Sequence, residues 1–417
     1  MFVKFASNIY MERFQTYTLS NGIRLVYMRS NSKVSHLGFL INAGSRDEKD
    51  QEQGIAHFIE HVLFKGTKTR SSLDIIRCLE ENGGDLDAYT TKEETCIHAS
   101  FLSEDFEKAM DLFSDIFFHS TFPTKEIEKE KGVVLDEILS YEDNPSEKIF
   151  DDFEEMMFPE HPIGRNILGT PEHVKKFSKK DLKNFITENY HTNEMVLSLV
   201  GNISFQSFVS IAEHCVGNIP ENLRKDKRII ATGTNPFQKK IRKNTHQIHC
   251  VLGNTAYSVF DEKRLGMVLL NNILAGQNMN SRLNLSLREK HGLVYTIESS
   301  YNPFADTGLF LIYFGTEKKH LELSLELIHK ELRDLTEKKL TKEQVEKAKK
   351  QIKGQIAISS ESNASLMLTM AKSILLFNKV DTIEDVFRKI DVITNSQLLE
   401  IAKEILIPEK LSCLIYK

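Results

Sequence analysis

Two histidines, His57 and His61, stand four residues apart, and a glutamate, Glu60, directly precedes the second. Side chains at positions i and i+4 lie one above the other on a helix face, so both imidazoles can reach one metal ion. Zinc readily takes such nitrogen ligands. A carboxylate beside a ligand is well placed to act as a general base on a metal-activated water. The spacing H-x-x-E-H therefore indicates a zinc site with hydrolytic chemistry.

The segment around these residues has the pattern of a helix. Apolar residues recur at the spacing of one helix face between residues 51 and 65, and a glycine then ends the pattern; the apolar positions are Ile55, Phe58, Ile59, Val62 and Leu63. An ordinary amphipathic helix with two surface histidines would show the same periodicity. A chain with 14 histidines contains H-x-x-E-H by chance in roughly a few per cent of cases, so the metal interpretation depends on further ligands.

A third protein ligand is needed, because catalytic zinc sites usually have three. Residues 126–142 are rich in glutamate and also have a helical pattern, which a Pro-Thr pair opens. Glu130 and Glu137 lie seven residues apart, about two helical turns, and so share one face. Spacing alone leaves Glu130, Glu137 and Glu142 open as the third ligand.

The pattern Gly-x-x-His-x-x-Glu-His-x-x-Phe-x-Gly-Thr at residues 54–67 resembles the inverzincin metallopeptidases, the pitrilysin/insulinase family. Residues 133–138 resemble the distal-ligand segment of that family, which implies Glu137 as the third ligand. Glu130 matches its second acidic position, which implies a residue that fixes a histidine ring or the water. The resemblance covers nearly the whole chain. Its length is similar to that of half-size members, such as mitochondrial processing peptidase subunits and their bacterial relatives.

Two further segments carry the resemblance. Residues 83–90 look like the substrate-binding strand of the family, an exposed edge to which an extended peptide adds as a further strand; its contact residues would be Asp87, Ala88, Tyr89 and Thr90. Asp87 departs from the asparagine usual in the family, which changes the polarity of that contact. In the second half, Arg288 and Tyr295 resemble the Arg/Tyr pair of the family. The resemblance implies that Tyr295 donates to the developing oxyanion, and that Arg288 orients it or grips substrate backbone.

The composition excludes several other classes of function. A net charge of −5 over 417 residues gives no basis for binding nucleic acid or an anionic membrane surface. Five cysteines without a C-x-x-C pair indicate neither a disulfide framework nor a thiolate zinc site. No apolar run approaches the roughly 18 residues of a membrane-spanning helix, and the first ten residues lack the apolar segment of a signal peptide. We therefore expect a cytoplasmic protein with a peptide substrate, no nucleic acid and no membrane.

The two halves of the sequence resemble each other. A strand pattern at residues 36–43, followed by the acidic triplet 47–49 and the motif helix, recurs at 249–256 and 261–263. The two triplets lie 214 residues apart (261 − 47). With this offset, His57, Glu60 and His61 correspond to Asn271, Leu274 and Ala275 in that order. The second copy therefore has no metal site.

The duplication predicts two homologous domains: residues 1–222 with the zinc site, and residues 223–417 without it but with the Arg/Tyr pair. We expect a solvated linker at about residues 220–235, where the chain is rich in Lys, Arg, Asn and Gly.

The remaining patterns indicate the fold class. An Asn-Gly pair between strands at 16–19 and 23–27 predicts a hairpin with a type I′ turn. Further strands are expected at 85–91 and 95–101, and helices at about 104–117, 124–142 and 178–189. Hairpins with grouped helices indicate an α+β fold, in which each domain is a largely antiparallel sheet with helices packed on one face.

These observations lead to one main hypothesis and two alternatives. We predict a zinc-dependent endopeptidase with one Zn²⁺ per chain, which cleaves peptides or unfolded segments held as an added strand in an enclosed chamber. Because the metal site and the Arg/Tyr pair occur in one chain, we expect a homodimer whose protomers share each active site. The first alternative is a non-catalytic or structural partner subunit of a processing-peptidase-like heterodimer. The second, a zinc-stabilised structural domain, would need a fourth protein ligand.

Overall fold

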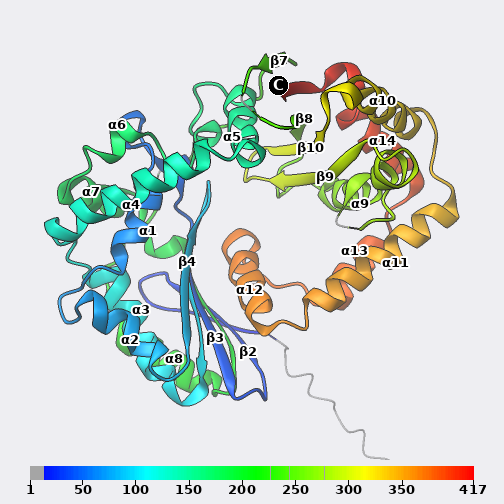
Figure 1. The fold of residues 1–417 in the computed structure, drawn as a ribbon. Helices are drawn as coiled ribbons and strands as arrows, with labels where there is room; N and C mark the ends of the chain where they lie inside the picture. Colours follow the sequence, from blue (N-terminus) through cyan, green and yellow to red (C-terminus); the bar gives the residue numbers. More distant parts are fainter. Residues whose placement is uncertain (1–13, 226, 244, 277) are drawn as a thin grey trace, which may run out of the picture.

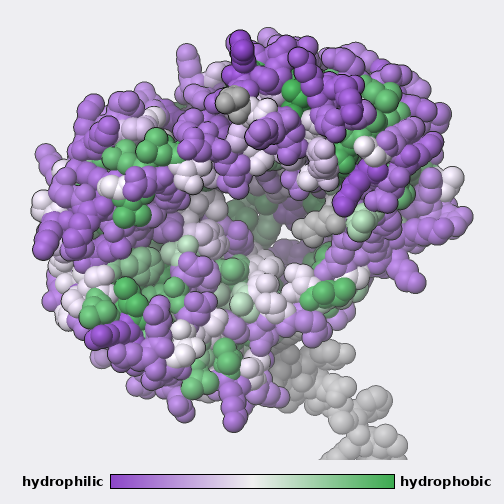
Figure 2. Space-filling view, viewed as in Figure 1, coloured by the Kyte–Doolittle hydropathy of each residue, from purple (hydrophilic) through white to green (hydrophobic). Residues whose placement is uncertain are grey.

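The structure, a computed structural model, describes residues 14–225, 227–243, 245–276 and 278–417. It contains two halves, each built from one sheet with helices, and these halves face one another (Figure 1). The space-filling view shows a mostly hydrophilic outer surface that is hollowed between the two halves (Figure 2). This arrangement confirms the predicted α+β class with two similar domains. The residues examined for a signal peptide, 1–10, lie outside the described part.

The sheet of the first half has six strands, most of them antiparallel. From one edge to the other these are β1 (Gln15–Thr18), β2 (Arg24–Arg29), β6 (Met195–Gly201), β3 (Val34–Ile41), β5 (Thr95–Leu102) and β4 (Asp85–Thr90). Among the described strands of this sheet, only the β2–β6 pair is parallel. Strand β4 thus lies at an edge of the sheet, as expected for residues 85–91.

The sheet of the second half repeats this topology without the first strand. Its order is β7 (Gln238–Ile241), β11 (Ser412–Tyr416), β8 (Ile248–Ala256), β10 (Gly308–Thr316) and β9 (Val294–Pro303). The β7–β11 pair is parallel, in the same position as the β2–β6 pair. Strand β9 therefore corresponds to β4, and both occupy sheet edges.

The helices follow the predicted order. Those of the first half are α1 (Ile55–Leu63), α2 (Ser72–Glu80), α3 (Phe106–His119), α4 (Thr124–Glu142), α5 (Pro145–Met157), α6 (Pro171–Val174), α7 (Lys179–Asn189) and α8 (Phe205–Val216). The second half contains α9 (Arg264–Ala275), a π-helix η6 (Asn284–Lys290), α10 (Leu321–Glu337), α11 (Lys342–Ser359), α12 (Asn363–Phe377), α13 (Ile383–Asp391) and α14 (Asn395–Ile405). No helix among the described residues is both long enough and apolar enough to cross a membrane. A cytoplasmic location stays a prediction.

Each half also covers the free face of the other sheet with one helix (Figure 1). Helix α12 of the second half buries Met367, Met370 and Ile374 against the first sheet. Helix α5 of the first half buries Ile149 and Phe153 against the second sheet. Each such side chain contributes about 1.5–3 kcal/mol when fully buried, so this exchange ties the halves together.

The first hairpin differs from the prediction in its turn. Thr18 pairs with Arg24, and Leu19 accepts a hydrogen bond from the backbone N–H of Gly22. Gly22 has a φ of +94°, but Asn21 is not among the residues with positive φ. A type I′ turn needs positive φ at both central residues, so the connection is instead a three-residue loop with glycine at its last position.

The predicted linker is anchored rather than solvated at two of its arginines. The Nη2 atoms of Arg224 and Arg228 each lie 2.7 Å from the buried carboxylate of Asp47. Burial by itself would raise the pKa of Asp47, but the two guanidinium groups outweigh it and lower that pKa. The described residues between α8 and β7 form neither helix nor strand. The boundary at residues 222/223, which falls there, stays a prediction.

A buried arginine, Arg46, joins the first half, the linker and the second half. Its guanidinium contacts Glu93 at 2.6 Å and Asp306 at 2.5 and 2.7 Å, and it donates to the carbonyl of Ile229 at 2.7 Å. Asp306 belongs to the turn between β9 and β10. The charge of Arg46 is therefore compensated by partners from both halves.

Candidate metal centre

Helix α1 carries the H-x-x-E-H residues and begins at Ile55, four residues later than predicted. Gly54 precedes it with a φ of +92°, and a Cβ at this position would lie 2.5 Å from the carbonyl oxygen of Leu168. The carboxylate of Glu48 accepts the backbone N–H groups of Gly54 and Ala56, both at 2.9 Å. Burial raises the pKa of Glu48 to about 8, against the effect of these two bonds. The start of α1 is thus fixed by a buried cap.

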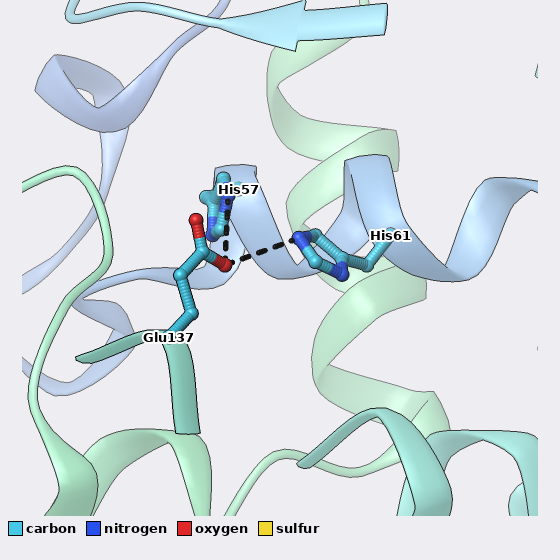
Figure 3. A group of neighbouring side chains, drawn as sticks. All are labelled: His57, His61 and Glu137. Atoms are coloured by element: carbon cyan, nitrogen blue, oxygen red, sulfur yellow. Dashed lines mark ion pairs between the residues drawn. The ribbon is translucent and has the colours of Figure 1, made fainter. Parts of the chain in front are cut away.

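Helix α4 packs against α1 and places Glu137 next to both histidines (Figure 3). Oε2 of Glu137 lies 3.8 Å from Nε2 of His57 and 3.5 Å from Nε2 of His61. Two ligands about 2.1 Å from a tetrahedral zinc ion are about 3.4 Å apart. The three donor atoms lie within 4.8 Å of one another, so their separations suit a single ion.

The donor set also fits zinc chemically. Two imidazole nitrogens and one carboxylate oxygen form a ligand set of catalytic zinc sites, which keep a further position open. Burial, together with the neighbouring His61, lowers the pKa of His57 to about 3, so this ring is neutral at pH 7. Zinc binds histidine in its neutral form. The residues present therefore suit a resident zinc ion.

Of the three glutamates left open by spacing, only Glu137 joins the group of metal-binding geometry in the described part of the chain. Glu130 is buried and contacts the other ring nitrogen of His61: its Oε2 lies 3.3 Å from Nδ1. Glu142 lies 3.1 Å from Lys148. The three acids of α4 thus have different partners.

Glu60 lies on α1 between the two histidines and contacts the edge strand. Its Oε2 accepts a hydrogen bond from the hydroxyl of Thr90 at 2.5 Å. Burial raises the pKa of Glu60, while the Thr90 hydroxyl and His61 oppose this shift. A carboxylate with a raised pKa is well suited to take and return a proton.

The four residues of β4 that were expected to contact substrate have different surroundings. Its outer edge has no paired strand among the described residues, so its backbone groups are available for an added strand. Asp87 accepts a hydrogen bond from the N–H of Ala88. The ring of Tyr89 packs against α12 and lies below the ammonium group of Lys372. Thr90 contacts Glu60, which the sequence did not predict.

Among the described residues, neither Arg288 nor Tyr295 contacts the candidate metal-site residues of the same chain. Arg288 lies in the π-helix η6, about half exposed, and its nearest charged partner is Glu289 at 4.0 Å. Tyr295 is the second residue of β9, is 61% exposed, and donates to Glu317 at 3.3 Å. Both side chains are therefore accessible to a second molecule.

Sequence reasoning missed two residues that hold the centre. One is Glu48, which caps α1, and the other is Lys65, whose Nζ lies 2.9 Å from Oε1 of Glu130. Lys65 falls at the end of the segment predicted as helical, residues 51–65, but the helix ends at Leu63 and Lys65 belongs to the turn that follows, so helical spacing did not indicate it. Glu48 precedes the helix by seven residues, and the intervening chain conceals its role as a cap.

Comparisons with known proteins agree with this fold and with the family that the motifs indicated. Residues 24–171 match the family described as "Insulinase (Peptidase family M16)", and residues 176–352 match "Peptidase M16 inactive domain". The metal-site residues fall within the first match, and Arg288 and Tyr295 fall within the second. The chain therefore belongs to peptidase family M16, as its motifs indicated.

Similar proteins occur in several bacteria. The chain is 34% identical to an uncharacterized zinc protease, YmxG, of Bacillus subtilis (strain 168), over 93% of this chain and 95% of that protein. It is 32% identical to an uncharacterized zinc protease of Rickettsia felis, over 94% and 95%. Among solved structures, a protease from Helicobacter pylori matches with a TM-score of 0.89 at 20% identity, over 97% of this chain and 99% of that one. A "peptidase M16 inactive domain" from Pseudomonas fluorescens matches with a TM-score of 0.90 at 21% identity, over 97% and 98%. These two likenesses concern the fold.

Proposed function

We propose that this protein is a zinc-dependent endopeptidase that hydrolyses extended peptides with a metal-activated water. The observation that carries the proposal is the convergence of His57, His61 and Glu137, with Glu60 on the same helix. The relatives named zinc proteases support the same activity. His57, His61 and Glu137 would hold one zinc ion per chain. When bound, zinc supplies Lewis acidity that polarises a carbonyl and makes hydroxide available at neutral pH.

In this proposal, Glu60 carries out the proton transfers. Its Oε2 is held by the Thr90 hydroxyl, which leaves Oε1 to take a proton from the attacking water. The same carboxyl group then returns the proton to the nitrogen of the leaving amine. Burial of Glu60 supports these proton transfers, because it disfavours the charged carboxylate and so raises the pKa of this group.

The substrate would bind as an added strand on the outer edge of β4, with its main chain paired to residues 85–90. This mode favours flexible peptides or unfolded segments over folded proteins. The hollow between the halves supports an enclosed chamber (Figure 2). Arg288 and Tyr295 lie exposed in the second half, and we propose that they complete the site of a partner protomer in a homodimer.

Replacement of the general base tests this function. Glu60→Gln keeps the shape of the side chain but cannot accept the proton, so peptide hydrolysis should fall by about 10²–10⁴-fold while zinc content stays near one per chain. Zinc is measured by elemental analysis, and turnover is measured on an unstructured fluorogenic peptide. Glu128→Gln, an exposed change on α4, is the control. Near wild-type turnover in Glu60→Gln would show that another group is the base.

A non-catalytic partner subunit is the other candidate. Such a subunit would be expected to lack a ligand or the base, whereas this chain has all four residues in one place. We therefore favour the catalytic function.

A further inference from the structure

A lysine in the turn after α1, Lys65, contacts the carboxylate that lies next to His61. Its Nζ lies 2.9 Å from Oε1 of Glu130, while Oε2 of the same carboxylate lies 3.3 Å from Nδ1 of His61. Lys65 lies two residues beyond the end of α1, in the turn that follows the helix. Glu130 reaches both from α4. One carboxylate is therefore shared between a cation in the turn after α1 and a ring nitrogen on α1.

This arrangement fixes the plane of the Glu130 carboxylate. A glutamate has three side-chain torsions, and a single hydrogen bond to His61 would leave rotation about the last of them free. The ion pair to Lys65 holds Oε1, which aims Oε2 at the ring. His61 can then donate from Nδ1, and its Nε2, 3.5 Å from Glu137, is left as the acceptor nitrogen that a metal needs.

The two histidines differ in their need for such support. His57 has a side chain that is 11% exposed, and its Nδ1 has no hydrogen-bond partner among the described residues. That ring therefore has no polar support at its Nδ1. The side chain of His61 is 21% exposed, and its Nδ1 contact is to Glu130. The orientation of His61 thus depends on a polar support that His57 lacks.

We propose that Lys65 is a positioning residue that acts through Glu130 to orient His61 and thereby sets the affinity of the site for zinc. The inference rests on the proposed zinc centre and adds a residue that is separated from the ion by Glu130 and His61. It predicts that zinc affinity falls when Lys65 loses its charge, although Lys65 touches no metal ligand.

Zinc binding to purified protein, measured by competition with a chromophoric chelator, tests the inference. Lys65→Met keeps the length of the aliphatic chain, and it should weaken zinc binding by about 10-fold, the lower limit typical of residues that support metal ligands. Lys65→Arg should restore most of the affinity, because it can still donate to Oε1. Lys129→Met is the matched control, since Lys129 forms an ion pair with Glu126 at 2.9 Å on α4. The control should bind zinc like the wild type.

Two further measurements separate positioning from general stability. If Lys65 acts through Glu130, then adding Lys65→Met to Glu130→Gln should cause little further loss of affinity. The metal-free forms of wild type and Lys65→Met should unfold at similar temperatures in the presence of a chelator. Equal zinc affinity in Lys65→Met and wild type, or fully additive losses with Glu130→Gln, would overturn the inference while the proposed peptidase stands. A wild-type chain that binds no zinc would overturn both.

Discussion

The candidate metal centre of the first half has a counterpart in the second half, in which the metal-binding side chains and the general base are replaced. Helix α9 and strand β9 occupy the positions of α1 and β4 in a sheet of the same topology. Helix α11 corresponds to α4, and their first residues lie 218 apart (342 − 124). With this offset, Glu137 corresponds to Gln355. The two regions therefore share a frame and differ in the side chains placed on it.

The counterpart retains a cavity of about 570 Å³. Its lining includes Asn271, in the position of His57, and also Gln355 and Ser299. Asn271 donates to the carbonyl of Ser299 at 3.2 Å, which ties α9 to β9. Neutral amides and hydroxyl groups thus occupy the region where the first half has imidazoles and a carboxylate.

This difference shows that the frame does not require the metal. The second sheet packs its helices around its own apolar core with Leu274 and Ala275 buried in the places of Glu60 and His61. Structural zinc sites, by contrast, provide folding energy directly, and their domains unfold without the ion. We infer that zinc in the first half supplies chemistry rather than stability.

The strongest test of the comparison removes one side chain from each region. His57→Ala should lose zinc and abolish peptide hydrolysis, because two protein ligands hold the ion poorly. Asn271→Ala should leave both unchanged and lower the free energy of unfolding by about 1 kcal/mol, the worth of one hydrogen bond. Elemental analysis, turnover and thermal unfolding of both variants give the answer. A loss of zinc in Asn271→Ala would contradict the division of roles.

The second prediction asks whether the two regions cooperate between protomers. Glu60→Gln and Tyr295→Phe should each be nearly inactive alone. If Tyr295 acts on the partner's site, a mixed dimer contains one site with both groups intact. Random mixing makes half of the dimers mixed, so activity should return to about a quarter of the wild-type value. Turnover is measured after subunit exchange has been verified with differently tagged chains; no recovery would rule out the shared site.

The third prediction concerns the residue that joins the two halves. Arg46→Met leaves Glu93 and Asp306 without their shared cation, and breaking a buried ion pair costs about 3–5 kcal/mol. We expect a lower midpoint in chemical denaturation, with the loss near 3 kcal/mol because both acids are partly exposed. Lys49→Met is the control, since its pair with Glu188 is exposed and worth about 0–1 kcal/mol. Equal midpoints in the two variants would show that Arg46 does not tie the halves together.

Much of this organisation could be predicted from the sequence. Helical periodicity located α4 at residues 124–142, and the repeat predicted two similar domains. Both features can be read directly from the order of residue types along the sequence. The start of α1 was missed because it is set by two tertiary contacts of Gly54, one with Leu168, which is distant in sequence, and one with the buried carboxylate of Glu48. The helix exchange between the halves was missed for the same reason: amphipathic patterns show which face is apolar but not which sheet receives it.

In the candidate site, too, spacing along the sequence predicted some residues, whereas tertiary contacts decide the others. Spacing identified the two histidines and Glu60, but it left three glutamates of α4 open, and the third ligand came from the family resemblance. The choice depends on the crossing of α4 over α1, which brings Glu137 to the Nε2 atoms and Glu130 to Nδ1. Helical periodicity cannot give that crossing. The anchoring of the linker by Arg224 and Arg228 is likewise a tertiary contact, whereas their charges alone indicated solvent exposure.

The last prediction concerns the difference between these two glutamates in zinc binding. Glu137→Gln removes a charged ligand and should lose zinc severely, whereas Glu130→Gln should weaken zinc binding or activity by about 10–100-fold. The difference follows from their contacts, because an amide at Glu130 can still accept from Nδ1 of His61 through its oxygen. Zinc titration of both variants ranks the two residues directly. The opposite ranking would assign the third ligand to Glu130 in place of Glu137.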